Sequence, residues 1–256
     1  MQKALKVENV NLTYAGSQVQ ALENVSFSLP LGCRAALVGP NGAGKSSLMK
    51  AILGLEKGVV GKIELLCQSD NIAQLIEKKV AYIPQSSQVN WAFPARVFEI
   101  VLMGRFSHSK GILKRPSKLD KELAEAALER MNLQDLRNRQ IDELSGGQRQ
   151  RVFIARALCQ EAECYLMDEP LAGIDSLTET IIMDTLKEFQ EEGKTSLVIH
   201  HDLSTLNQYF DYLIWLNRTI IAAGPLHEVL TDQAYQATYG LGNPFEPQRK
   251  GSDSHV

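Results

Sequence analysis

The segment Gly39–Ser46 has the composition of a phosphate-binding loop. It fits the Walker A pattern G-x-x-x-x-G-K-[ST] at every fixed position. Its glycines let backbone N–H groups turn inward around phosphate oxygens, because no Cβ stands in the way. Lys45 would supply a positive charge to the β- and γ-phosphates, and Ser46 would offer a hydroxyl to Mg²⁺. We therefore expect ATP and Mg²⁺ to bind here, with contacts from Gly39, Pro40, Asn41, Gly42, Ala43, Gly44, Lys45, Ser46 and Ser47.

A pair of carboxylates, Asp168 and Glu169, supplies the complementary chemistry. The pair ends the apolar run Tyr165–Met167, which is typical of a buried strand. Open α/β sheets place their sites at the carboxyl edge of such strands. We expect Asp168 to hold Mg²⁺ through water and Glu169 to act as the general base for an attacking water.

A third segment, Leu144–Gln148, indicates a second anion-binding site. Ser145 and two glycines precede a helix predicted from Gln148 to Leu158, and a helix N-terminus attracts anions. One chain then has two phosphate-binding ends with a long helical stretch between them. We interpret this as a head-to-tail dimer of two copies. Each ATP would lie between the Lys45 loop of one copy and the other copy's Ser145, Gly146, Gly147 and Gln148.

The elements around these segments predict an α/β fold. Before the phosphate loop comes a short apolar run, Ala35–Val38, and after it a predicted helix, Lys45–Leu53. Alternating residues in Val7–Leu12 and Val25–Leu29 predict strands of an antiparallel element. Further strands are predicted at Val80–Ile83, at Thr195–Ile199 and, as a pair, within Tyr212–Ala223, and helices at Val97–Met103, Leu119–Met131, Leu226–Tyr239 and, from a capping box at Ser176, up to Gly193.

These elements suggest one ATPase domain over residues 1–240, followed by a polar tail at 241–256. Residues 1–87 and 160–240 would form the core with its antiparallel β subdomain. Residues 88–159 would form an inserted helical subdomain, because their apolar residues recur at the three-to-four spacing of helices.

Composition narrows the class of protein. A net charge of −3 lacks the basic excess of a nucleic-acid-binding domain, so we expect no nucleic-acid partner, and we interpret the run Lys110–Arg115 as a solvated face. No apolar run reaches the ~18–20 residues that span a bilayer. We expect a cytoplasmic protein that reaches a membrane only through a partner. The four cysteines have no metal-site spacing, and we expect buried or half-buried free thiols.

The phosphate loop, the carboxylate pair and Leu144–Gln148 together resemble the ATPases of the ABC family. The resemblance runs from about Leu5 to Tyr239 and implies a P-loop NTPase core with a RecA-like mixed sheet. It also implies roles for four further residues. Tyr14 would stack on adenine, Gln85 would sense Mg²⁺ and water and link to a permease, Asp175 would contact the dimer partner, and His201 would contact the γ-phosphate and orient the attacking water. His200 competes with His201 for the last role, but the family pattern places the histidine directly before the aspartate.

The cargo follows from resemblance alone. The segments Ala81–Pro94, Val101–Arg105, His200–Leu203 and Ile221–Pro225 are similar to those of bacterial manganese, zinc and iron import ATPases. This implies an integral membrane permease and an extracytoplasmic metal-binding protein as partners. It also implies a permease-gripping surface at Trp91 and Phe93, although both could instead be core residues. An importer or exporter of another solute, and more remotely a non-transport ABC ATPase, are the alternatives.

Overall fold

A six-stranded sheet forms the centre of the computed structural model, which describes residues 2–108 and 115–240. Its strand order is β5-β6-β7-β3-β8-β9. Five strands are parallel, and only β9 at the edge is antiparallel to its neighbour. The strands are β3 (Arg34–Val38), β5 (Val80–Ile83), β6 (Cys164–Met167), β7 (Thr195–Ile199), β8 (Tyr212–Asn217) and β9 (Thr219–Pro225). These strands confirm the ones predicted at Ala35–Val38, Val80–Ile83, Tyr165–Met167 and Thr195–Ile199 and the pair predicted within Tyr212–Ala223.

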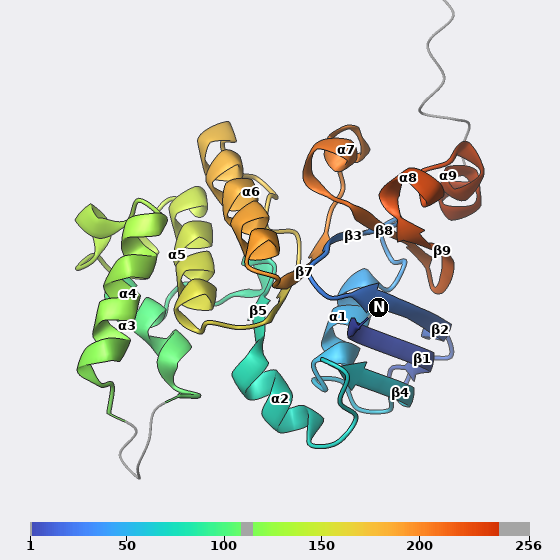
Figure 1. The fold of residues 1–256 in the computed structure, drawn as a ribbon, viewed down its shortest axis with the longest axis horizontal. Helices are drawn as coiled ribbons and strands as arrows, with labels where there is room; N and C mark the ends of the chain where they lie inside the picture. The colour runs from blue at the N-terminus through green and yellow to red at the C-terminus, as the bar shows by residue number, and fades with distance from the viewer. Residues whose placement is uncertain (1, 109–114, 241–256) are drawn as a thin grey trace, which may run out of the picture.

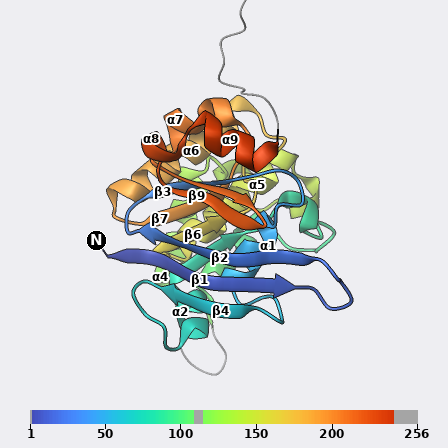
Figure 2. The same cartoon turned by 90° about the vertical axis from the view of Figure 1, so that its right-hand side faces the viewer.

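A separate three-stranded antiparallel sheet has the order β2-β1-β4. It contains β1 (Lys3–Thr13), β2 (Gln20–Pro30) and β4 (Val60–Leu65). The first two confirm the strands predicted from alternation. The sequence analysis missed β4, which is an edge strand with a mostly exposed first half and therefore shows little alternation. Figure 2 shows this sheet face on, with β2, β1 and β4 side by side.

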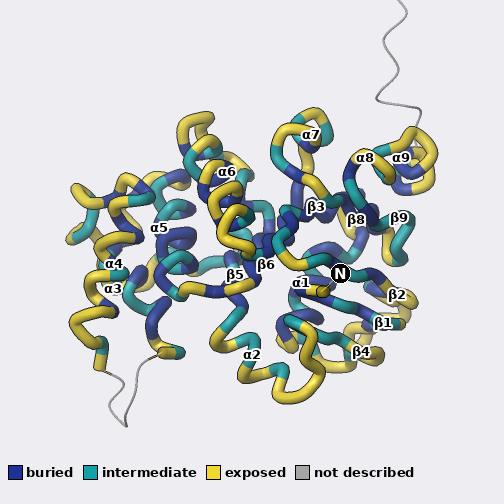
Figure 3. Tube along the Cα trace, viewed as in Figure 1, coloured by how far each residue is buried: buried dark blue, intermediate teal, exposed yellow. Residues whose placement is uncertain are grey.

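The central sheet is covered by hydrophobic cores on both faces. On one face α1 (Lys45–Ile52) and the antiparallel sheet pack together. The other face carries the longer helices, which lie on the left of Figure 1. The longer helices are α4 (Lys118–Arg130), α5 (Gly146–Cys159) and α6 (Ser176–Glu191), and the six-residue helix α3 (Val97–Leu102) packs with them. Alternate residues of β3 point into different cores, and all of Ala35–Val38 is buried, as Figure 3 shows for the centre of the molecule.

Shorter helices fill the connections. They are α2 (Ile72–Lys79), α7 (Leu206–Tyr209), α8 (Leu226–Val229), α9 (Asp232–Tyr239) and the 3₁₀ turns η1 (Ser86–Gln88), η2 (Met103–Arg105), η3 (Gln134–Leu136), η4 (Ile141–Glu143) and η5 (Leu203–Thr205). The single helix predicted over Leu226–Tyr239 is wrong. It is split into α8 and α9 because Thr231 is extended and accepts a hydrogen bond from the N–H of Ala234, which starts a new helix.

Two further expectations need correction. The residue that caps α6 is Asp175, whose side chain accepts a hydrogen bond from the N–H of Thr178, so the predicted capping box at Ser176 is wrong. Cys33, Cys159 and Cys164 are buried free thiols as expected, but Cys67 is exposed.

Lys110, Lys114 and the tail at 241–256 lie outside the described residues. Among the helices that the structure describes, none is long and apolar enough to cross a membrane.

Candidate nucleotide site

The phosphate loop connects β3 to α1, and the side chain of its Lys45 bonds back to the start of the loop. Lys45 is 6% exposed, and its Nζ donates to the carbonyl oxygens of Gly39 (2.7 Å) and Pro40 (3.0 Å). Burial lowers the pKa of Lys45, while the nearby carboxylates Glu169 and Asp168 oppose that shift. In the part of the chain that the structure describes, the ammonium therefore bonds to backbone carbonyls of its own loop, and phosphate oxygens would be stronger acceptors.

The turn between β8 and β9 supports this loop from behind. The N–H of Arg218 donates to the carbonyl oxygen of Ala43 (2.8 Å). The carbonyl oxygen of Leu216 lies so close to Gly39 that a Cβ there would be 2.0 Å away. Sequence reasoning missed these supports. No side-chain pattern could have revealed them, because backbone atoms make both contacts.

Asp168 lies at the carboxyl end of β6, as predicted. It is 0% exposed, and neither of its buried carboxylate oxygens has a hydrogen-bond partner of good geometry. Burial raises the pKa of Asp168, although the Ser46 hydroxyl beside it opposes the shift. A buried carboxylate without strong partners is costly unless a cation balances it. The Asp168 carboxylate and the nearby Ser46 hydroxyl are therefore oxygen donors that fit Mg²⁺, which prefers hard oxygen ligands.

Two residues that lie far apart in the sequence, Gln85 and His201, meet at Glu169. The Gln85 side chain donates from Nε2 to Oε2 of Glu169 (2.7 Å), and His201 donates from Nε2 to Oε1 (2.6 Å). The backbone of Glu169 has a φ of 50°, which is uncommon for a residue with a side chain. Such conformations persist where the surroundings impose them, often at functional sites.

The two candidate histidines lie in different environments. His201 is half exposed and faces Glu169. His200 is 6% exposed, bonds to the Thr205 hydroxyl through Nε2 (2.8 Å) and lies against the Phe210 ring. Burial lowers the pKa of His200. Only His201 is therefore placed to act together with Glu169.

The Ser145 segment starts α5 on the other side of the central sheet from α1 (Figure 1). Ser145 is exposed and caps the helix, with its hydroxyl accepting from the N–H of Gln148 (3.3 Å) and the Gln148 side chain accepting from the N–H of Ser145 (3.0 Å). Gly147 packs closely against the Asp175 loop, because a Cβ there would lie 3.3 Å from Oδ2 of Asp175. Within one chain the structure thus does not bring Ser145 and Lys45 together.

The family model described as "ABC transporter" matches residues 22–172. The chain is 46% identical to the manganese transport system ATP-binding protein MntB of Bacillus subtilis over 97% of this chain and 98% of that one. It is 42% identical to the zinc transport system ATP-binding protein TroB of Treponema pallidum over 98% and 93%. The chain belongs to the ABC transporter family. A dimeric post-hydrolysis ATP-binding cassette bound to ADP and phosphate matches the fold with a TM-score of 0.74, at 27% identity over 87% of this chain and 98% of that one.

Membership makes this chain an ATPase that binds adenine nucleotides, and ABC ATPases work as dimers with a membrane permease. The structure of this ABC ATPase places Tyr14 next to the phosphate loop. Its hydroxyl donates to Oγ of Ser47 on α1 (2.9 Å), and 37% of the residue is exposed. Its ring is therefore accessible from solvent beside the loop, which is compatible with stacking on a base.

In this ABC ATPase, Trp91 and Phe93, which were both predicted to form a permease-gripping surface, lie in different environments. Trp91 packs edge-on against Phe153 (5.1 Å between ring centroids) and donates from Nε1 to the carbonyl oxygen of Ser86 (3.0 Å), so it is largely structural. Phe93 is 54% exposed. A cavity of about 250 Å³ beside Glu169 and His201 is lined partly by residues that the sequence did not single out as functional: Leu171, Ala172, Glu179, Ile199 and Asp202.

Proposed function

We propose that this chain hydrolyses ATP through Glu169 and so energises a membrane permease that imports a divalent metal ion. The observation that carries the catalytic part is the convergence of Gln85 and His201 on the carboxylate of Glu169, next to the buried Asp168. Two side chains from separate segments would have no structural need to meet at one half-buried carboxylate.

Glu169 is proposed as the general base. A carboxylate can accept the proton of the water that attacks the γ-phosphate. His201, bonded to the same carboxylate, would orient that water and contact the γ-phosphate, and Gln85 would report the state of the site to the permease. Lys45 would leave the carbonyl oxygens of its own loop for the β- and γ-phosphates, with the N–H groups of the glycine-rich loop around them.

Asp168 and Ser46 would hold Mg²⁺, with Gln85 as an additional oxygen donor. The fit rests on the unpaired buried carboxylate of Asp168 and its hydroxyl neighbour. The ion would neutralise charge on the phosphates as it develops. The adenine would stack on Tyr14, with the remaining nucleotide contacts made by residues 39–47.

Ser145 is proposed to act on the ATP of a second copy. Its exposed position at the start of α5, away from the Lys45 loop of its own chain, supports a head-to-tail dimer. Asp175 would contribute at the same interface, because its loop packs on Gly147. Two ATP molecules would close the dimer, and hydrolysis would reopen it.

Residues 88–159 are proposed as the helical subdomain, with the core formed by 1–87 and 160–240. An open cavity of about 410 Å³ is lined from both parts: by Met103, Gly104, Phe106, Ser107 and Arg156 of residues 88–159, and by Glu77, Tyr82 and Gln160 of the core. Phe106 is 48% exposed there. Because aromatic residues are enriched at the centres of interfaces, this cavity is where we place the permease, on the inner face of the cell membrane.

The metal cargo is inferred from the relatives, which are named for manganese and zinc transport. By the same inference an extracytoplasmic metal-binding protein would deliver the ion to the permease. Import of another small solute is the alternative.

Uptake of radioactive Mn²⁺ and Zn²⁺ by a deletion strain tests the proposal. Complementation with the wild-type gene should restore uptake of one of these ions, and complementation with Glu169→Gln should not. Restoration by both genes would contradict the role of Glu169. A deletion strain with normal uptake of both ions would contradict the metal cargo.

A further inference from the structure

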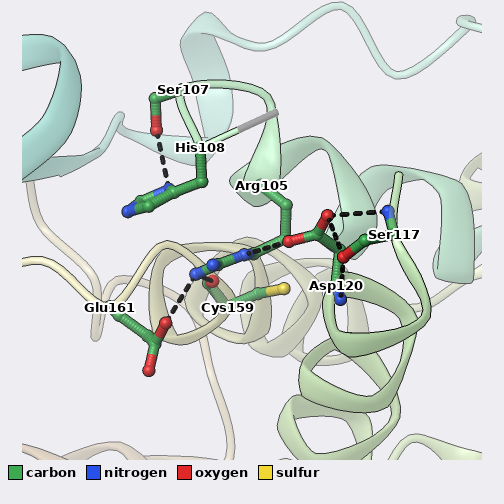
Figure 4. Close-up of polar contacts among 7 residues, drawn as sticks. All are labelled: Arg105, Ser107, His108, Ser117, Asp120, Cys159 and Glu161. Carbon is green, nitrogen blue, oxygen red and sulfur yellow. Dashed lines mark hydrogen bonds and ion pairs between the residues drawn. The ribbon is translucent and has the colours of Figure 1, made fainter. Parts of the chain in front are cut away.

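A buried arginine joins the surface of the 410 Å³ cavity to the helix that begins at Ser145. Arg105 is 5% exposed, and its guanidinium reaches two other elements (Figure 4). Nε donates to Oδ1 of Asp120 on α4 (2.9 Å), while Nη1 donates to the carbonyl oxygen of Cys159 at the end of α5 (2.9 Å) and to Oε2 of Glu161 just beyond it (2.7 Å).

The carboxylate of Asp120 is itself held in place from the other side. Its Oδ2 accepts from the N–H and the hydroxyl of Ser117 (both 2.8 Å), and the Ser117 hydroxyl accepts from the N–H of Asp120 (3.1 Å). Burial alone would raise the pKa of Asp120, but the bonds from Arg105 and Ser117 outweigh it and hold the pKa at about 2. The Arg105–Asp120 pair is therefore ionised throughout the physiological range.

The backbone beside Arg105 lies directly on α5. A Cβ on Gly104 would be 2.3 Å from the carbonyl oxygen of Arg156, so no other residue fits without displacing the helix. The next residue after Arg105 is the exposed Phe106, which lines the cavity. A partner that binds at Phe106 therefore contacts backbone that is fixed to the carboxyl-terminal end of α5 by Gly104 and by Arg105.

The other end of α5 carries Ser145. The helix has 14 residues, which corresponds to about 21 Å at 1.5 Å per residue. Such a length of hydrogen-bonded helix moves as a unit. A displacement of η2 would thus reach the serine that faces the partner's nucleotide.

We propose that Arg105 is a positioning residue that makes η2, the start of α4 and α5 one rigid body, so that permease binding at the cavity moves Ser145. The inference rests on the proposed docking of a permease at this cavity. Stability alone does not account for the arrangement, because well-packed apolar residues stabilise a buried position as well as an ion pair does, or better. A planar guanidinium that spans α4 and the end of α5 fixes their relative geometry instead.

Arg105→Lys tests the role with the least damage to the fold. Lysine keeps a positive charge next to Asp120, so the buried carboxylate is not left unpaired, but a single ammonium cannot reproduce the fork that reaches both helices. Arg137→Lys is the matched control. Arg137 also bonds a carboxylate of α4, that of Glu125 (2.7 Å), but the pair is half exposed and does not reach the end of α5.

The measurement compares ATP turnover of the isolated chain with turnover of the complete complex in proteoliposomes, using the membrane subunit that copurifies with this chain from its own cells. We expect Arg105→Lys to hydrolyse ATP normally in isolation and to assemble with the membrane subunit. Its stimulation in the complex should fall about fivefold or more, the lower end of typical coupling between sites. Arg137→Lys should behave as wild type in both assays.

Three results would overturn the proposal and are distinguishable. Full stimulation of Arg105→Lys would remove the coupling role and leave the proposed function intact. An equal loss of isolated and stimulated turnover would make Arg105 merely structural. If the membrane subunit does not change turnover of the wild type, the proposed docking fails together with the role of Arg105.

Discussion

Replacing Glu169 by glutamine tests the chemistry of the site most directly. The amide keeps the shape of the side chain and one oxygen acceptor, so it can still bond Gln85 or His201 in the half-buried position that Glu169 occupies. It cannot accept a proton from water. We therefore expect ATP binding and dimer closure to persist while hydrolysis stops, which traps an ATP-bound dimer.

The size of the effect follows from the role. A positioned general base accelerates a reaction about 10²–10⁴-fold, which is ~3–5 kcal/mol of activation free energy at 1.36 kcal/mol per factor of ten. The Glu169 site offers no direct substitute among the residues that bond it, because Gln85 is an amide and His201 donates to the same carboxylate. The loss should therefore lie in the upper part of that range.

Phosphate release in single-turnover conditions, with gel filtration in ATP, measures both consequences. Glu179→Gln is the matched control, because Glu179 lines the same 250 Å³ cavity but has no hydrogen bond to Glu169. The reasoning is refuted if Glu169→Gln hydrolyses ATP within a factor of a few of wild type. It is also refuted if Glu179→Gln loses as much activity, since the effect would then come from charge in the cavity and not from a base.

Three further predictions concern the loop, the dimer and the buried histidine. Gly39→Ala should lower the melting temperature by about 4–8 °C, because its Cβ would overlap the carbonyl oxygen of Leu216 at a cost of ~2 kcal/mol; calorimetry without nucleotide checks this, and an unchanged transition contradicts it. In mixed dimers with one Ser145→Arg copy, only the site formed with the other copy's Lys45 loop should fail, and two working sites would exclude the shared-site dimer. Burial depresses the pKa of His200, so below about pH 6.5 the unfolded chain binds a proton that the folded chain does not. The free energy of unfolding should therefore decrease as the pH is lowered through this range. Urea titrations at pH 7 and pH 5 should show a smaller difference in that free energy for His200→Gln than for the wild type, and an equal difference would contradict this role of His200.

Much of the fold could be predicted because local signals agree with the tertiary structure. The strand, loop and helix around Gly39–Ser46 form as expected, since apolar run, glycine spacing and helix start all point to one arrangement. Weak local signals failed. Strand β4 is half exposed, so burial imposes little alternation on it, and the eight-residue α2 packs only partly buried residues such as Ile72 and Ile76 against the core. The break between α8 and α9 depends on one threonine cap inside an otherwise helical stretch.

The choice between His200 and His201 rested on a resemblance in the sequence, whereas their environments are a property of the fold. The two residues are adjacent at the end of β7, where successive side chains point in opposite directions. One enters the apolar core against Phe210, and the other faces Glu169. The exposure of Cys67 is likewise a property of the fold, because the spacing of cysteines along the sequence does not indicate which of them is buried.

The sequence by itself determined the nucleotide chemistry of this protein. Backbone geometry around Gly39–Ser46 and the carboxylates after β6 are local features, fixed by residue types within a few positions of one another. Only the tertiary structure decided which distant residues are in contact: Gln85 and His201 at Glu169, the β8–β9 turn behind the phosphate loop, and Arg105 between α4 and α5. Those contacts depend on how strands and helices pack across the whole chain, and packing is set by many residues jointly.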